Sequence, residues 1–171
     1  AMEAGPAEYQ NASDELRRIL SELPDCDFLS NDERSVIRRE AREGYVTVRT
    51  RGAENLFSSG LSQLQADEYD TAKETFESVD TVVSETKEVV QNWDAVSTDK
   101  LDELQRKARS GYADAYTNSI EKRISEGIET FENDHYEEAE KAFHEASAEA
   151  EAAGDNIEPE INQDRISHLQ E

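Results

Sequence analysis

The chain has 171 residues, with 18 Lys and Arg against 41 Asp and Glu, so its formal net charge is −23. A surface this acidic repels phosphate and argues against nucleic-acid binding. The single cysteine, Cys26, excludes an internal disulfide and a multi-cysteine metal site, and no run approaches the ~18 apolar residues of a membrane span.

The first predicted helix covers residues 9–23. Its apolar residues recur at alternating steps of three and four, a pattern typical of one helical seam, at Tyr9, Ala12, Leu16, Ile19 and Leu23. Pro24 ends the helix because it cannot continue the hydrogen-bonded ladder. We expect Phe28 and Leu29 to pack beneath the loop that follows.

A long helix is predicted over residues 31–65. Ser30 has the chemistry of an N-cap, and Asp32 and Glu33 fall in the first turn, where the helix dipole favours anions. The apolar spacing stays at three to four residues without a proline, which predicts a helix about 50 Å long. Gly44 and Gly52 are the two positions at which it could break. After a turn at 66–68, the same spacing predicts a returning helix from residue 69 to residue 93.

The chain then repeats itself without a gap at a distance of 67 residues, which indicates a repeat architecture. Ser30, Asp32, Arg39, Gly44, Gly60, Tyr69 and Phe76 recur as Ser97, Asp99, Arg106, Gly111, Gly127, Tyr136 and Phe143. The copy predicts a long helix at about 98–132, with Gly111 as a third possible break. A turn at 133–135 and a returning helix at 136–153, capped by Gly154, follow.

We therefore expect an all-α protein of antiparallel helical hairpins in a tandem duplication, either an α-solenoid or an elongated helical bundle. It forms one helical-repeat domain over residues 1–171. Repeat 1 spans 30–93 and repeat 2 spans 97–154. Residues 9–23 match a returning helix and form a partial unit, and 161–171 match the start of a further long helix. Each unit needs its neighbours to bury its apolar stripe.

Two segments carry a family resemblance. Gly60, Tyr69, Ala72 and Phe76, and the copies Gly127, Tyr136, Ala139 and Phe143, are similar to the tetratricopeptide repeat, in which a small residue closes the first helix against an aromatic-led second helix. The resemblance covers about 53–86 and 120–153. It implies peptide binding through first-helix positions, here Phe57, Leu61, Leu64, Ile124, Ile128 and Phe131, for which core packing is the expected use. The large apolar residues that the family places beside the glycines are replaced by polar ones, Ser59 and Gln63, then Glu126 and Thr130.

The composition as a whole is similar to that of haloarchaeal proteins, with few lysines, many carboxylates and abundant Ala, Ser and Thr. A charge of −23 loosens a compact state in ordinary buffer. At ~1 M salt the Debye length falls to ~3 Å and the repulsion is screened. An acidic protein from an ordinary cell is the alternative.

The most distinctive local charge lies in residues 30–51, where six arginines face four carboxylates, a balance of +2. Arg34, Arg38 and Arg42 follow one another at intervals of four and share a helix face. The sharper hypothesis for these three residues is a docking stripe for an acidic partner or for a flanking domain. Arg39 and Arg42 recur as Arg106 and Arg109, so we expect these two to pair with acids of adjacent helices.

No catalytic motif or phosphate loop is recognised, and the three histidines lack metal-ligand spacing, so we expect no enzyme, no cofactor and no metal. The expected function is a protein-interaction or scaffold module that binds a protein or peptide, with self-association through open repeat ends as a further possibility. A structural spacer, the soluble part of an envelope or membrane-anchored protein, and a regulatory domain of a larger enzyme are the alternatives. The expected location is a high-salt cytosol; an extracellular or membrane-anchored parent protein stays open.

Overall fold

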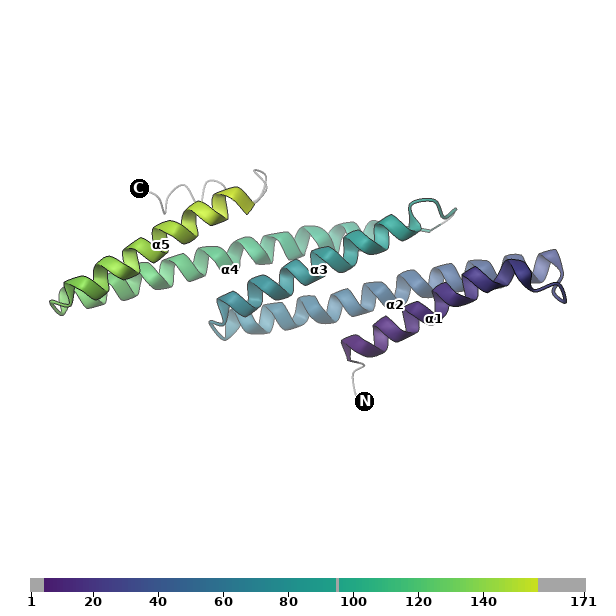
Figure 1. Ribbon diagram of the computed structural model, residues 1–171, viewed down its shortest axis with the longest axis horizontal. Helices are drawn as coiled ribbons and strands as arrows, with labels where there is room; N and C mark the ends of the chain where they lie inside the picture. Colours follow the sequence, from purple (N-terminus) through teal and green to yellow (C-terminus); the bar gives the residue numbers. More distant parts are fainter. Residues whose placement is uncertain (1–4, 95, 157–171) are drawn as a thin grey trace. The chain divides into compact units, whose positions relative to one another are not determined.

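The computed structural model describes residues 5–94 and 96–156, and this part of the chain is all-α, without strands. Its elements are α1 (Pro6–Glu22), the short 3-10 helix η1 (Leu23–Asp25), α2 (Asn31–Gln65), α3 (Tyr69–Val90), α4 (Asp99–Glu132) and α5 (Tyr136–Asn156). Consecutive α-helices are antiparallel, joined by short connections (Figure 1). The predicted fold class is confirmed.

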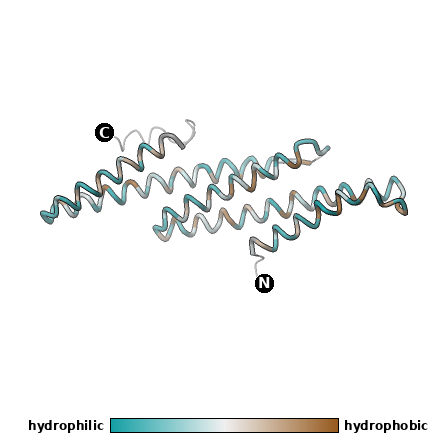
Figure 2. Tube along the Cα trace, viewed as in Figure 1, coloured by the Kyte–Doolittle hydropathy of each residue, from teal (hydrophilic) through white to brown (hydrophobic). Residues whose placement is uncertain are grey.

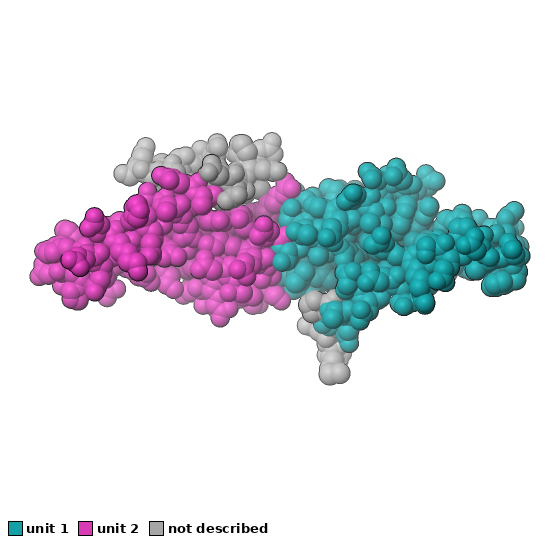
Figure 3. All heavy atoms as spheres, viewed as in Figure 1, with its two compact units in different colours: residues 1–58, 78–106 teal, residues 59–77, 107–171 magenta. Residues whose placement is uncertain are grey.

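The chain forms two compact units (Figure 3). Unit 1 combines Ala1–Ser58 with Ser78–Arg106, and unit 2 combines Ser59–Glu77 with Lys107–Glu171. Each unit therefore joins segments that are far apart in the sequence. The α4–α5 turn lies in unit 2, whereas the α1–α2 connection lies in unit 1.

The predicted start of α2 is confirmed. The Glu33 backbone N–H donates to Ser30 Oγ at 3.3 Å, and the Ser30 backbone N–H donates to the Glu33 carboxylate at 2.9 Å, so the two residues form a reciprocal cap. These bonds to Ser30 lower the pKa of Glu33 from its ordinary value. The helix then continues to Gln65 without a break at Gly44 or Gly52, and α4 continues through Gly111 in the same way.

The turns that close the α2–α3 and α4–α5 hairpins share one geometry. Asp67 and Asp134 both adopt a left-handed backbone, with φ of 59° and 62°, which aspartate tolerates better than most residues. In each turn a tyrosine hydroxyl donates to that aspartate, from Tyr69 at 2.7 Å and from Tyr136 at 2.6 Å. The backbone bonds into the turn also recur 67 residues apart, as Glu68 N to Gln63 O and His135 N to Thr130 O.

Close packing in both hairpins depends on a glycine beneath an aromatic ring. A β-carbon at Gly60 would lie 2.8 Å from the Phe76 ring, and one at Gly127 would lie 2.7 Å from the Phe143 ring. Real side chains do not approach so closely, so only glycine lets the two helices of each hairpin meet here.

Small side chains dominate the buried core, which includes Ala53 and Val83 in unit 1 and Ile120, Ala146 and Ala150 in unit 2. Figure 2 shows the consequence along the trace, where short apolar bands alternate with polar stretches on every helix. Small residues bring the helix axes close but bury little apolar area each. Polar contacts between helices therefore carry more of the specificity of packing.

Some details of the sequence-based prediction are wrong. Gly154 does not cap α5, because the helix continues to Asn156. Phe28 is 85 % exposed, since a tight turn closed by the Leu29 N–H and the Cys26 carbonyl leaves it at the corner. Trp93 follows the end of α3 rather than lying on it. Residues 161–171, expected to open a further unit, lie outside the described residues.

Candidate functional site

The structure divides the arginines of residues 30–51 into members with different environments. Arg38, Arg39 and Arg42 line a cavity of about 200 Å³ beside the connection between α3 and α4, and we call these three residues the arginine cluster. Glu43 and Asp94 are the carboxylates in its wall. Three arginines against two carboxylates leave the cavity with a positive balance of one in a chain whose net charge is −23.

Arg34, the first member of the predicted docking stripe, is held within the chain. Its guanidinium donates to the Pro24 carbonyl at 3.3 Å and to the Asn31 side-chain oxygen at 3.4 Å. These bonds tie the start of α2 to the end of η1. Arg34 does not line the cavity, so the structure brings Arg38 and Arg42 together but not Arg34.

One member of the cluster, Arg42, packs on a pair of aromatic rings. The Arg42 guanidinium carbon lies 5.4 Å from the centroid of the Trp93 ring, a cation–π geometry. Trp93 in turn meets the buried Tyr45 edge-on, with ring centroids 5.4 Å apart. The guanidinium of Arg42 is thus held against a fixed surface. Trp93 is the only tryptophan of the chain, and the sequence had placed it at the end of the predicted returning helix, 69–93.

Arg38 and Arg39 make no hydrogen bond or ion pair with the rest of the described chain, residues 5–94 and 96–156. Sequence reasoning had assigned Arg39 to an intramolecular pair because it recurs as Arg106, and it missed Arg39 as a member of the cluster. The recurrence of an arginine 67 residues later shows that the sequence is duplicated. It does not show which carboxylates lie close enough to pair with that arginine.

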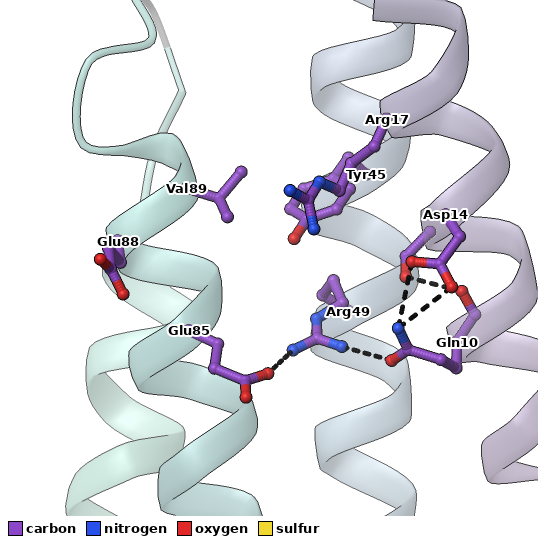
Figure 4. A pocket seen from close by; sticks show the side chains of 9 residues that line it. Gln10, Asp14, Arg17, Tyr45, Arg49, Glu85, Glu88 and Val89 are labelled. Carbon is purple, nitrogen blue, oxygen red and sulfur yellow. Dashed lines mark hydrogen bonds and ion pairs between the residues drawn. The ribbon is translucent and has the colours of Figure 1, made fainter. Parts of the chain in front are cut away.

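Arg49 lies in the same stretch of sequence but is buried and fully engaged. It donates from Nε to Thr86 Oγ1 at 3.0 Å, from Nη1 to Gln10 Oε1 at 2.7 Å and from Nη2 to Glu85 Oε2 at 2.8 Å. Figure 4 shows the side chain between Gln10 of α1 and Glu85 of α3. The guanidinium therefore connects three helices of unit 1.

A polar cavity of about 260 Å³ opens beside Arg49, lined by side chains of α1, α2 and α3 that include Asp14, Arg17 and Glu88 (Figure 4). Tyr45 also lines it, and burial raises the pKa of the Tyr45 hydroxyl from its ordinary value. Its wall carries two arginines against three carboxylates, a negative balance of one, so it offers an anion less than the arginine cluster does.

Unit 2 has its own buried charged group. Glu149 of α5 accepts from Lys73 of α3 at 2.6 Å and from Arg123 of α4 at 2.7 Å, and the side chains of Lys73 and Glu149 are 14 % and 11 % exposed. Burial alone would raise the pKa of Glu149, but the hydrogen bonds from Lys73, Ser119 and Arg123 lower it. This network fixes the register of the three helices in unit 2.

Several large apolar side chains of unit 2 are exposed. Leu61, Ile128 and Phe131 are among the positions for which the sequence predicted core packing, and each is exposed in the structure. Tyr136 and Phe143 of α5 are exposed as well. The helical spacing identified these residues as apolar but could not tell which side of each helix has a neighbour.

Within the described ranges no group of three or more His, Cys, Asp or Glu residues is arranged to hold a metal ion. His135 lies 3.3 Å from the Glu138 carboxylate, both on the surface. None of the described helices is long and apolar enough to cross a bilayer.

Comparison of the chain with protein-family models, with curated proteins and with solved structures finds no match.

Proposed function

We propose that this chain is a non-catalytic protein-interaction module that holds an acidic segment of a partner protein on the arginine cluster of α2. The observation that carries the proposal is the state of Arg38 and Arg39. In a chain with 41 carboxylates they face a cavity and have no partner among the described residues. Arg49 and Arg123, by contrast, are paired with acids of neighbouring helices.

The chemistry of the cluster suits a carboxylate-rich peptide. A guanidinium donates two parallel hydrogen bonds to one carboxylate, which adds geometry to charge. Arg42, held on Trp93, gives the site one fixed wall, while Arg38 and Arg39 are available to the ligand. Direct bidentate contacts also persist in concentrated salt, because the two charges are about as close as the Debye length of ~3 Å at ~1 M salt.

A tetratricopeptide-like organisation and a salt-rich cytosol belong to the same proposal. The contacts of Gly60 with Phe76 and of Gly127 with Phe143 support the first, because that family closes its hairpins with a small residue against the second helix. The formal charge of −23 supports the second, because such a charge is best tolerated where salt screens it.

Site-specific photo-crosslinking tests the proposal. A photoreactive amino acid replaces Ser35, an exposed residue in the cavity wall, and the protein is irradiated in cells or in lysate held at high KCl. We expect crosslinks to one acidic segment, reduced about tenfold when Arg38 and Arg39 are both changed to Glu, since charge reversal replaces attraction by repulsion. The matched control is Arg51→Glu, an exposed arginine on the same helix. Equal crosslinking in the double variant and the wild type contradicts the proposal.

A structural spacer is the second candidate. The uninterrupted helices α2 and α4 favour it, because a helix of this length spans about 50 Å. A spacer, however, gains nothing from exposing Leu61, Ile128 and Phe131, which a binding module can use. Shortening α2 and α4 by whole turns separates the two candidates, because it impairs a spacer and leaves binding at the arginine cluster intact.

A further inference from the structure

The contact between α3 and α4 shows how the outer side of a returning helix is covered in this protein. Gly111 of α4 lies over the Phe76 ring, where a β-carbon would be 2.6 Å away. Further along α4, Tyr116 receives the Lys73 ammonium 4.4 Å from its ring centroid, and Lys122 lies 5.7 Å from that of Tyr69. Successive residues of α4 contact successively earlier residues of α3, so α4 runs antiparallel to α3. All of these contacts lie within unit 2.

Within residues 5–94 and 96–156, the copy of α3 has the same inner contact but no such cover. Phe143 of α5 packs on Gly127 as Phe76 packs on Gly60, but Phe143 is 40 % exposed whereas Phe76 is 1 % exposed. Tyr136, the copy of Tyr69, is 56 % exposed. Among the described residues, no second glycine approaches Phe143 and no cation approaches the Tyr136 ring.

We propose that the face of α5 formed by Tyr136, Glu140 and Phe143 binds an amphipathic helix of a partner protein, antiparallel to α5 and with a glycine over Phe143. Further along, the partner helix carries a cationic side chain opposite Glu140 and another over Tyr136. This surface lies in unit 2 and is separate from the arginine cluster in unit 1.

The charge of α5 decides the character of the partner helix. Its acidic residues outnumber its basic residues by seven to one. In α3, Lys73 is covered by the aromatic ring of Tyr116. The equivalent residue of α5 is Glu140, a carboxylate, so a cation is the side chain that best covers it. A helix with Lys or Arg on both sides of its apolar stripe therefore complements this face.

A second copy of the chain does not supply such a helix. Two α5 faces brought together would oppose their carboxylates. The glycine-bearing long helices are already covered, because α2 packs on α1 through Gly44 and Gly52, and α4 packs on α3 through Gly111 and on α5 through Gly127. The excess of carboxylates on α5 favours a basic helix of a different protein as the occupant.

A peptide with the sequence of residues 104–126 provides the probe, since this stretch of α4 performs the covering role on α3. Tyr116 is changed to Arg in the peptide to meet Glu140, and a fluorophore is attached at one end. Binding to the full chain is measured by fluorescence anisotropy at ~2 M KCl, and at lower salt as a second condition. The control peptide carries Gly111→Leu in addition, because a side chain at this position meets the Phe143 ring.

We expect the control peptide to bind at least about tenfold more weakly, since overpacking of a close contact is unfavourable. On the protein, Phe143→Ala and the surface change Glu140→Lys should each weaken binding of the probe by about tenfold, with the loss for Glu140→Lys larger at lower salt. Glu140→Lys leaves the helix packing untouched and so keeps the test valid if Phe143→Ala unfolds the hairpin. The matched control is Phe28→Ala, an exposed phenylalanine of unit 1.

Two results overturn the proposal. The first is equal binding of the glycine and leucine peptides, or binding that is insensitive to both Phe143 and Glu140. The second is reversible dimerisation of the chain, seen by sedimentation velocity and abolished by Phe143→Ala, which would make a second copy the occupant.

Discussion

Phe76 occupies the space that a side chain at Gly111 would need, because a β-carbon built there would lie 2.6 Å from the ring. The same ring is 2.8 Å from the corresponding position at Gly60 on the other side. One phenylalanine thus sets how closely α3 meets both α2 and α4, and it is 1 % exposed.

The first prediction concerns the glycines of the long helices. Gly111→Ala should lower the free energy of unfolding by about 1–3 kcal/mol, because an aromatic ring cannot move aside cheaply. Gly44→Ala is the matched control, since its β-carbon would lie 3.5 Å from the Leu16 side chain, an ordinary contact. That variant should be neutral or more stable by up to ~1 kcal/mol, because alanine favours the helix. Chemical denaturation followed by circular dichroism measures both, and equal effects would show that the close approach is unimportant.

The second prediction concerns Arg49. Arg49→Lys should destabilise unit 1 by about 2 kcal/mol, because lysine cannot reach Gln10, Thr86 and Glu85 with one ammonium group. Arg51→Lys, at an exposed neighbouring position, should change the free energy of unfolding by less than about 0.5 kcal/mol. Hydrogen exchange resolved along the chain should place the loss of protection in α1 and α3. Unchanged protection there would mean that the guanidinium contacts contribute nothing net.

The third prediction is a pH dependence that arises from Glu149. Burial raises its pKa, hydrogen bonds from Lys73, Ser119 and Arg123 lower it, and the balance is a pKa below the ordinary value of 4.5. A carboxyl group with a lowered pKa stabilises the fold above its unfolded pKa, and the stabilisation is lost as the pH falls through the folded pKa. Unfolding should therefore become easier below about pH 4.5.

Glu149→Gln tests this assignment. At neutral pH the variant should be less stable by about 2 kcal/mol, because an amide forms weaker hydrogen bonds with Lys73 and Arg123. It should also show a shallower loss of stability on acidification, since one linked proton has been removed. Glu151→Gln, at an exposed position of the same helix, controls for a change of charge alone. Parallel acid titrations of Glu149→Gln and the wild type would rule out the assignment.

The fourth prediction is that added salt stabilises the fold. Raising KCl from ~0.1 M to ~2 M shortens the Debye length from ~10 Å to a few ångströms and screens the repulsion of a chain with charge −23. The midpoint of thermal unfolding should rise with KCl. A variant with Glu129, Glu132, Glu137 and Glu138 changed to Gln should show a smaller rise, because these carboxylates cluster around one turn. A salt-independent midpoint in both proteins would argue against adaptation to molar salt.

Local sequence features were sufficient to predict the helices. The uninterrupted spacing of apolar residues predicted residues 31–65 and about 98–132, and the structure places α2 and α4 at Asn31–Gln65 and Asp99–Glu132. Ser30 and Glu33 identified the start of α2 because capping uses only neighbours in the chain. The prediction for Gly154 was wrong since a glycine ends a helix only if it adopts a left-handed backbone, and the helix runs through it.

The environments of the candidate residues could not be predicted in this way. Arg38 and Arg49 look alike in the sequence, three turns apart on one amphipathic helix, yet the first faces a cavity and the second is buried against α3. Phe76 and Phe143 are copies that each pack on a glycine of the preceding long helix, yet only Phe76 is also covered by α4, and their exposures are 1 % and 40 %.

The sequence by itself determined the helices, their caps and turns, the duplication and the charge, because each depends on residues within a few turns of one another or on simple totals. The tertiary structure alone decided which arginines of the described residues are paired and which of their aromatic rings are covered. Those outcomes depend on which helix lies next to which, and the contacts that select a neighbour join residues tens of positions apart.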